Sequence, residues 1–286
     1  MSTEAPIPRW GSEAIDPRGF NIPSLKARYL LDHLPETGAV LEVGSGSGKI
    51  LRTLASHRPG LHVYGCDISD WTPPAGIEFR LMTHDIPYDD ATFDAVLVVD
   101  VLEHVPDPDH IVREIIRVLK PSGRFVGFVP IEGEPRSIHT LYRKLLGNDL
   151  YVQTKHHVSA FTYADVARLL DSRFEIVDTS HAYHLLGQIM DATFFAAARL
   201  PQLATFWWRD NKYYADGKNR ESLFVSALNR LLELGNGIAY LESRLLAKHS
   251  MGIAGLLFEA HVAQRHVISP QRWPSSASNS RRPPRS

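Results

Sequence analysis

The sequence predicts an α/β protein with a doubly wound, Rossmann-like, mostly parallel sheet of seven strands and a helical insertion before the last strand. Short apolar runs typical of buried strands alternate with segments whose apolar residues recur at helical spacing. The first run, residues 39–43, passes directly into a glycine-rich turn and a helix, the opening unit of many nucleotide-binding sheets. A nearly continuous apolar run at residues 93–99 indicates a parallel strand that is buried on both faces.

Composition places the chain among globular proteins. Its 286 residues, 44% of them hydrophobic and 22% charged, suit one large domain with an insertion. The formal net charge of −1 gives no overall attraction to nucleic acid, so no nucleic-acid partner is expected. The single cysteine excludes a disulfide framework and fits a reducing, cytoplasmic compartment. No apolar stretch reaches about 18 residues, so no membrane-spanning helix is expected.

The first part of the chain predicts alternating helices and strands. Ser24 is expected to cap a helix that ends before Pro35 and Gly38, and residues 1–23 are expected to form an irregular arm. A second helix follows the glycine turn and runs to about His57. The further elements expected here are strands at residues 62–67, 77–82, 93–99 and 124–129 and a helix at residues 109–119.

After residue 130 the alternation loosens. Helices are expected at residues 138–146 and after Thr162, a good N-cap, and a strand is expected at residues 174–179. Two long helical patterns, at roughly 187–209 and 220–248, precede a last strand at 252–262. The expected units are an arm (1–23), a core (24–186), a helical insertion that covers the substrate (187–248), the last strand (249–265) and a disordered basic tail (266–286).

Residues 39–50, AVLEVGSGSGKI, carry the motif around which the chain is organised. Gly44, Gly46 and Gly48 allow a sharp turn and a close approach of the backbone to a ligand. The helix that follows presents free N–H groups to that ligand. Asp67, at the end of the second strand, stands where nucleotide-binding sheets place a carboxylate for ribose hydroxyls.

Five pieces of sequence together resemble the class I S-adenosylmethionine-dependent methyltransferases, in particular small-molecule enzymes of the ubiquinone-biosynthesis type. The similarity covers roughly residues 24–130 and weakens towards residue 180. It implies S-adenosyl-L-methionine as the cofactor and a small-molecule methyl acceptor as the substrate. The five pieces are the glycine motif with Glu42, Asp67, Asp85-Ile86, FDAVLVVDVLEHV at 93–105 and LKPSGRFV at 119–126.

The resemblance implies roles for the residues around the glycine turn. The three glycines would approach the methionine part of the cofactor, with Glu42 beneath it. Asp67 would accept hydrogen bonds from the ribose hydroxyls, and Ile68 would pack on the adenine ring. A carboxylate at a strand end suits this role because it accepts two hydroxyl protons well.

The resemblance also implies roles for residues farther along the sheet. Asp85 would face the adenine amino group, the backbone N–H of Ile86 would face an adenine nitrogen, and Asp100 would lie near the methionine end. The sequence departs from the family at residues 68–76, where nine residues replace the usual helix. We expect Trp71 to fill the wall of the adenine pocket that this helix would supply.

Histidines near the strand ends are the candidate bases for methyl transfer. Placing the acceptor in line with the S–CH₃ bond supplies much of the catalysis, but an oxygen acceptor also needs a base. Histidine suits this role because its ordinary pKa is roughly 6.5. His104 follows the fourth strand, and His156 and His157 lie in a loop after the fifth. We therefore favour O-methylation, and carbon and nitrogen acceptors remain open.

Asp100, Glu103 and His104 form a candidate metal site. In a helix these positions would share one face, and with His156 or His157 they would offer ligands to a divalent metal. The segment resembles that of some metal-assisted O-methyltransferases, and it is also common in metal-free relatives. The metal-free interpretation is therefore favoured.

The aromatic and apolar residues of the segment 187–248 predict a hydrophobic acceptor, such as a quinone-like, lipid-linked or natural-product molecule. The same residues also suit core packing, a homodimer interface or peripheral contact with a membrane. One alternative function is an NAD(P)-dependent oxidoreductase, although the G-x-G-x-G spacing and the LEHV segment argue against it. Another is a non-catalytic protein that binds the cofactor without turnover.

Overall fold

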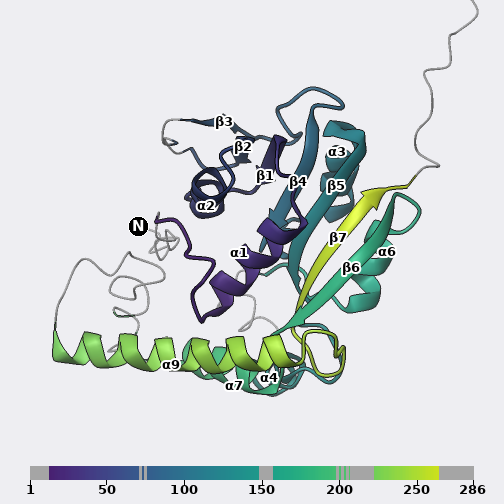
Figure 1. Ribbon diagram of the computed structural model, residues 1–286. Helices are drawn as coiled ribbons and strands as arrows, with labels where there is room; N and C mark the ends of the chain where they lie inside the picture. Colours follow the sequence, from purple (N-terminus) through teal and green to yellow (C-terminus); the bar gives the residue numbers. More distant parts are fainter. Residues whose placement is uncertain are drawn as a thin grey trace, which may run out of the picture.

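The computed structural model describes residues 13–70, 73, 76–147, 157–197, 200, 203, 206 and 222–263. The strands are β1 (Gly38–Val43), β2 (Leu61–Asp67), β3 (Ile77–Leu81), β4 (Phe93–Val99), β5 (Leu119–Pro130), β6 (Phe174–Ala182) and β7 (Gly255–Val262). They form one sheet in the order β3-β2-β1-β4-β5-β7-β6 (Figure 1). All neighbours pair in parallel except β7, which lies antiparallel between β5 and β6. The predicted seven-stranded, mostly parallel sheet is thus confirmed.

Helices pack on both faces of this sheet because its central strands are apolar on both sides. Alternate residues of β4 point in opposite directions: Ala95 and Leu97 pack towards one face, and Val96 and Val98 towards the other. The helices α1 (Ile22–His33) and α2 (Lys49–His57) contribute to the first cluster. The helices α3 (Pro108–Val118) and α6 (Tyr163–Leu170) contribute to the second.

The helix starts show which capping predictions were right. The side chain of Asn21 accepts a hydrogen bond of 2.8 Å from the N–H of Ser24, so Asn21 caps α1. The prediction that Ser24 is the cap was therefore wrong, and α1 begins two residues before it with Pro23 in its first turn. Thr162 caps α6 as predicted, in a capping box with Asp165.

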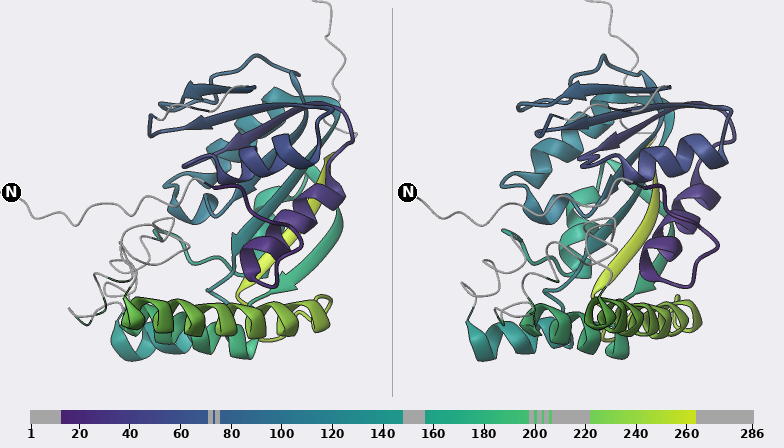
Figure 2. Two further views of the ribbon diagram at one scale, coloured as in Figure 1. Left: turned by 60° about the vertical axis from the view of Figure 1, so that its left-hand side comes forward. Right: turned by 90° about the vertical axis from the view of Figure 1, so that its left-hand side faces the viewer.

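A further layer of helices lies across one end of the sheet (Figures 1 and 2). It contains α4 (Ile138–Leu146), α7 (Leu185–Ala197) and α9 (Leu223–Leu245). The Gln188 side chain joins this layer to the sheet, because it donates to the Tyr183 carbonyl after β6 and accepts from the N–H of Ile138. The layer therefore lies where β5 and β6 end, at the edge of the sheet where open α/β proteins bind ligands.

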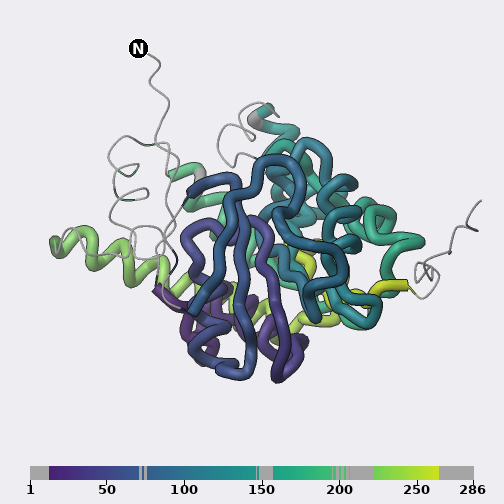
Figure 3. The backbone as a smooth tube through the Cα atoms, turned by 90° about the horizontal axis from the view of Figure 1, so that it is seen from above, coloured from purple at the N-terminus to yellow at the C-terminus, as the bar shows by residue number. Residues whose placement is uncertain are grey.

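The two long helical patterns predicted for residues 187–248 appear in part as α7 and α9. Seen from above, α9 projects well beyond the sheet (Figure 3). Trp71, Trp207 and Trp208 lie outside the described residues. Among the helices that the structure describes, none combines the length and the apolar character needed to cross a membrane.

Candidate active site

The glycine turn between β1 and α2 adopts a backbone that favours glycine at three positions. Gly44, Gly46 and Gly48 have φ angles of 73°, 52° and 73°. A Cβ atom on Gly44 would lie 2.4 Å from Cγ2 of Val101, whereas one on Gly46 would meet no described atom within 4 Å. Gly44 thus lets the chain pack on itself, while Gly46 faces space that a ligand can enter.

The carboxylate of Asp67 is fixed against this turn. Its Oδ2 accepts the N–H of Gly46 and its Oδ1 accepts the N–H of Ser69, both at 2.8 Å. A carboxylate has about four acceptor sites, so each oxygen can still accept a hydroxyl proton. Ile68 beside it has 72% of its surface exposed. The end of β2 therefore presents an acidic acceptor together with an apolar side chain.

Glu42 lies beneath the turn, fully enclosed at the end of β1. Its Oε2 atom is buried and has no hydrogen-bond partner among the described residues. Burial and the neighbouring negative charge of Asp67 raise its pKa well above the usual range. The environment therefore favours a proton on Glu42, which makes it able to donate a hydrogen bond beneath a bound ligand.

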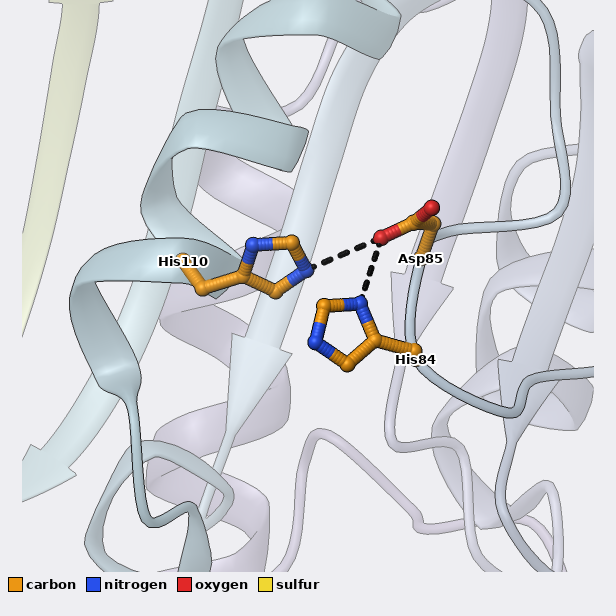
Figure 4. Close-up of side chains that lie close together, drawn as sticks. All are labelled: His84, Asp85 and His110. Atoms are coloured by element: carbon orange, nitrogen blue, oxygen red, sulfur yellow. Dashed lines mark hydrogen bonds and ion pairs between the residues drawn. The ribbon is translucent and has the colours of Figure 1, made fainter.

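Asp85 belongs to an exposed cluster with two histidines. Its Oδ1 atom lies 2.7 Å from Nδ1 of His84 and 3.1 Å from Nε2 of His110 (Figure 4). The hydrogen bond from His84, together with the charges of both imidazoles, lowers the pKa of Asp85. Two imidazoles thus already engage the carboxylate that the resemblance assigns to the adenine amino group.

The N–H of Ile86 has a partner within the protein. It donates to Oε2 of Glu114 on α3 at 3.0 Å, and the Ile86 side chain is buried. Hydrogen bonds from Arg117 hold the pKa of Glu114 below its usual value, so this acceptor is charged at neutral pH. In the structure this amide therefore donates to Glu114, and an adenine nitrogen would have to compete with that carboxylate.

Asp100 follows β4 in a left-handed conformation, with a φ of 54°. Nζ of Lys26, from α1, lies 2.6 Å from Oδ2 of Asp100 and 3.5 Å from the centre of the Phe128 ring. Beyond it only a short 3₁₀ turn forms, η1 (Leu102–His104). The expected helical face shared by Asp100, Glu103 and His104 is therefore wrong, because the left-handed residue interrupts the helix and pairs with Lys26.

Three of the candidate residues, Glu103, His104 and His157, do lie close together. Ligand atoms of Glu103, His104 and His157 all lie within 4.8 Å of one another, and the two imidazole rings stand nearly perpendicular with centres 4.9 Å apart. Both carboxylate oxygens of Glu103 are buried without a hydrogen-bond partner among the described residues. Burial and the charge of Asp100 raise the pKa of Glu103 well above its usual range. His156 lies outside the described residues.

Sequence reasoning missed Glu132, just beyond the end of β5. Its Oε2 atom lies 2.9 Å from Nδ1 of His157, and both side chains are largely buried. An acid at the end of a buried strand was the signal that identified Asp67, and the same signal would have identified Glu132. The pair gives His157 a fixed orientation, with its Nε2 on the side away from the carboxylate.

Comparison with known proteins shows which sequences this chain resembles. Residues 41–127 match the family model described as a methyltransferase domain. Over these residues the chain is similar to class I methyltransferases. It is 38% identical over 96 residues to a demethylmenaquinone methyltransferase of Tropheryma whipplei (strain Twist), a match that covers 30% of this chain and 39% of that protein. It is 32% identical over 127 residues to a ubiquinone biosynthesis O-methyltransferase of Xylella fastidiosa (strain 9a5c), covering 38% and 51%.

The chain spans about half or less of the length of the curated relatives it matches. Among solved structures, the [4+2]-cyclase SpnF is similar in fold, with a TM-score of 0.50 and 17% identity. That match covers 89% of this chain and 87% of SpnF. The family match argues against the oxidoreductase alternative, whereas the fold by itself leaves the reaction open.

Proposed function

We propose that the chain transfers a methyl group from S-adenosyl-L-methionine to a small, hydrophobic acceptor, with oxygen as the preferred acceptor atom. The observation that carries the proposal is the carboxylate of Asp67, held by the Gly46 amide beside an open glycine turn. Asp67 lies at this turn, and a negative charge on its carboxylate opposes a phosphate group. A cofactor with a sulfonium centre and ribose hydroxyls suits this environment better than a dinucleotide.

The residues of the turn fit such a cofactor. The space beside Gly46 admits its methionine part, and Asp67 retains acceptor sites for the ribose hydroxyls. The exposed Ile68 offers an apolar surface for a flat ring. When bound, the cofactor supplies an electrophilic methyl group on a positively charged sulfur. The protein supplies its position and the removal of a proton from the acceptor.

His157 is the proposed base. With Glu132 ionised, Nδ1 of His157 donates to Oε2 of Glu132, and Nε2 keeps the lone pair that takes the hydroxyl proton of the acceptor. Glu132 orients the ring of His157 and then stabilises the imidazolium that forms on it. His104 stands against the same ring with 41% of its side chain exposed.

The helical layer supports a hydrophobic acceptor. Leu185, Leu186 and Ile189 of α7 are about half exposed beside the strand ends. Apolar residues exposed near a ligand-binding edge favour an apolar ligand. The names of the two curated relatives, which refer to demethylmenaquinone and ubiquinone, point to the same class. A quinone-like phenol is therefore the first acceptor to test.

The decisive experiment separates cofactor binding from methyl transfer. The purified full chain is titrated with S-adenosyl-L-methionine and its demethylated product, then incubated with methyl-labelled cofactor and quinone-like phenols or fractionated extract. Labelled product supports the proposal. Binding without transfer to any acceptor would instead favour the non-catalytic alternative or a reaction of another kind, as the fold of SpnF allows.

A substitution then tests the base. His157→Asn is expected to lower kcat at least a hundredfold with an unchanged Kd for the cofactor, because a positioned general base typically contributes 10²–10⁴-fold. The matched control is His62→Asn, which changes an exposed histidine of β2 and should leave both values unaltered. Wild-type kcat in a folded His157→Asn variant would contradict the assignment.

A further inference from the structure

A second cluster of ligand-type side chains lies on the other side of Glu132. It consists of Glu132 after β5, His139 in the first turn of α4 and Asp191 in α7. The side chains of His139 and Glu132 are only 3% and 5% exposed, and that of Asp191 is 21% exposed. Three elements thus bring one imidazole and two carboxylates together away from solvent.

The spacing within this cluster is that of groups converging on one ion. Nε2 of His139 lies 3.4 Å from Oδ2 of Asp191 and 3.9 Å from Oε1 of Glu132. A direct N–H···O hydrogen bond spans about 2.7–3.2 Å. Metal–ligand bonds of about 2.0–2.2 Å place neighbouring ligand atoms roughly 3.0–3.6 Å apart. The separations found here match that range within a few tenths of an ångström.

The exposed cluster of His84, Asp85 and His110 shows the contrasting geometry. There both imidazoles reach the same carboxylate oxygen at 2.7 and 3.1 Å (Figure 4). The contact of His84 is a hydrogen bond and that of His110 is an ion pair, and the side chains of His84 and Asp85 are mostly exposed. The spacing around His139 therefore differs from that of this exposed cluster.

The buried acids near the cluster also suit a cation. Glu103, fully buried, lies within reach of His157, which in turn contacts Glu132. Three acids, Glu103, Glu132 and Asp191, therefore share one largely buried region. Burial favours the protonated form of a carboxyl group, and a bound divalent ion would supply two positive charges that let its ligands ionise.

We propose that Glu132, His139 and Asp191 bind a divalent transition cation such as Zn²⁺ or Mn²⁺. The imidazole ligand disfavours Ca²⁺ and Mg²⁺, which prefer oxygen alone, and water completes the coordination. The cation ties α4 and α7 to the end of β5. Glu132 directs Oε1 towards His139 and Oε2 towards His157, so the carboxylate that holds the ion also orients the proposed base.

Metal content tests this site independently of methyl transfer. The full, tag-free chain is stripped with a chelator, reloaded with Zn²⁺ or Mn²⁺, desalted and analysed by mass spectrometry for metal, with thermal unfolding in parallel. One cation per chain and a rise in Tm on reloading are expected. Competition with a chromophoric zinc indicator gives the affinity.

Asp191→Asn is the informative variant, because it keeps the shape of a partly exposed side chain. It should weaken metal affinity at least tenfold and abolish the rise in Tm, as should His139→Gln. The matched control His84→Ala removes an imidazole of the exposed cluster and should retain both properties.

Three outcomes would overturn the proposal. One is the absence of stoichiometric metal in the reloaded wild-type chain, and another is wild-type metal affinity in Asp191→Asn. The third is loss of metal in His104→Gln with retention in Asp191→Asn, which would assign the ion to Glu103, His104 and His157. If His139→Gln fails to fold, Asp191→Asn decides alone. None of these outcomes depends on turnover, so failure of the proposed methyl transfer remains distinguishable.

Discussion

Replacement of Asp67 by asparagine tests the cofactor site most directly. In the native chain the two carboxylate oxygens each accept one backbone N–H, from Gly46 and from Ser69. Asparagine keeps one oxygen, and its amide nitrogen then faces the other N–H. An unsatisfied buried donor costs about 1–3 kcal/mol, so the free energy of unfolding should fall by that amount. Loss of the charged acceptor for a ribose hydroxyl costs about 1.5–3 kcal/mol of cofactor binding.

The assay is isothermal titration of folded Asp67→Asn with S-adenosyl-L-methionine and its demethylated product, with urea unfolding in parallel. A loss of about 2 kcal/mol corresponds to a Kd about 30-fold higher, and we expect this for both ligands because both carry the ribose. The matched control is Asp70→Asn, the same change at an exposed position of the following segment, which should bind as wild type. A folded Asp67→Asn variant with wild-type Kd would refute the ribose role.

Three further predictions concern stability and reactivity. Burial raises the pKa of Cys66 to about 12, so a thiol reagent at pH 8 should label this residue only after unfolding; rapid labelling of the native chain would contradict its burial. Hydrogen bonding to Arg117 lowers the pKa of Glu114, so this acid stabilises the fold above about pH 4.3 and loses that effect as the pH falls through its folded pKa. Urea unfolding of Glu114→Gln should therefore show less stability than wild type at pH 7 and a smaller difference at pH 3.5. Gly44→Ala should destabilise the chain by about 1–3 kcal/mol more than Gly46→Ala, because both incur the left-handed backbone cost but only the former adds a clash. Gly46→Ala should instead weaken cofactor binding, and equal unfolding energies would argue against this division of roles.

Much of the fold was predictable because local patterns and tertiary packing agree. The apolar run of β4 specifies a strand buried on both faces, and Thr162 with Asp165 specifies a helix start. The cap of α1 was misplaced by three residues because Asn21 and Ser24 are both good caps, and only the direction of the Asn21 side chain decides between them.

The site was less predictable because its contacts join distant segments. Nothing local to Ile86 indicates that Glu114, on the following helix, takes its amide. The helical reading of the segment from Asp100 to His104 failed because the backbone turns left-handed where Lys26 of α1 pairs with Asp100. Local spacing therefore identified single residues at strand ends but not the partners that orient them.

The position of β7 governs the order in which this chain can fold. β6 pairs only with β7 in the described sheet, and β7 also completes the edge of β5. During synthesis, β5 and β6 are both made before α7 and α9, and the strand that joins them emerges only afterwards. Until then both strands present unpaired edges, and the apolar side chains of α9 lack a finished sheet end to pack beside. Pairing between strands that lie far apart in the sequence slows folding. Nascent chains of this protein should therefore depend on chaperones more than nascent chains of a protein of the same size with an all-parallel sheet.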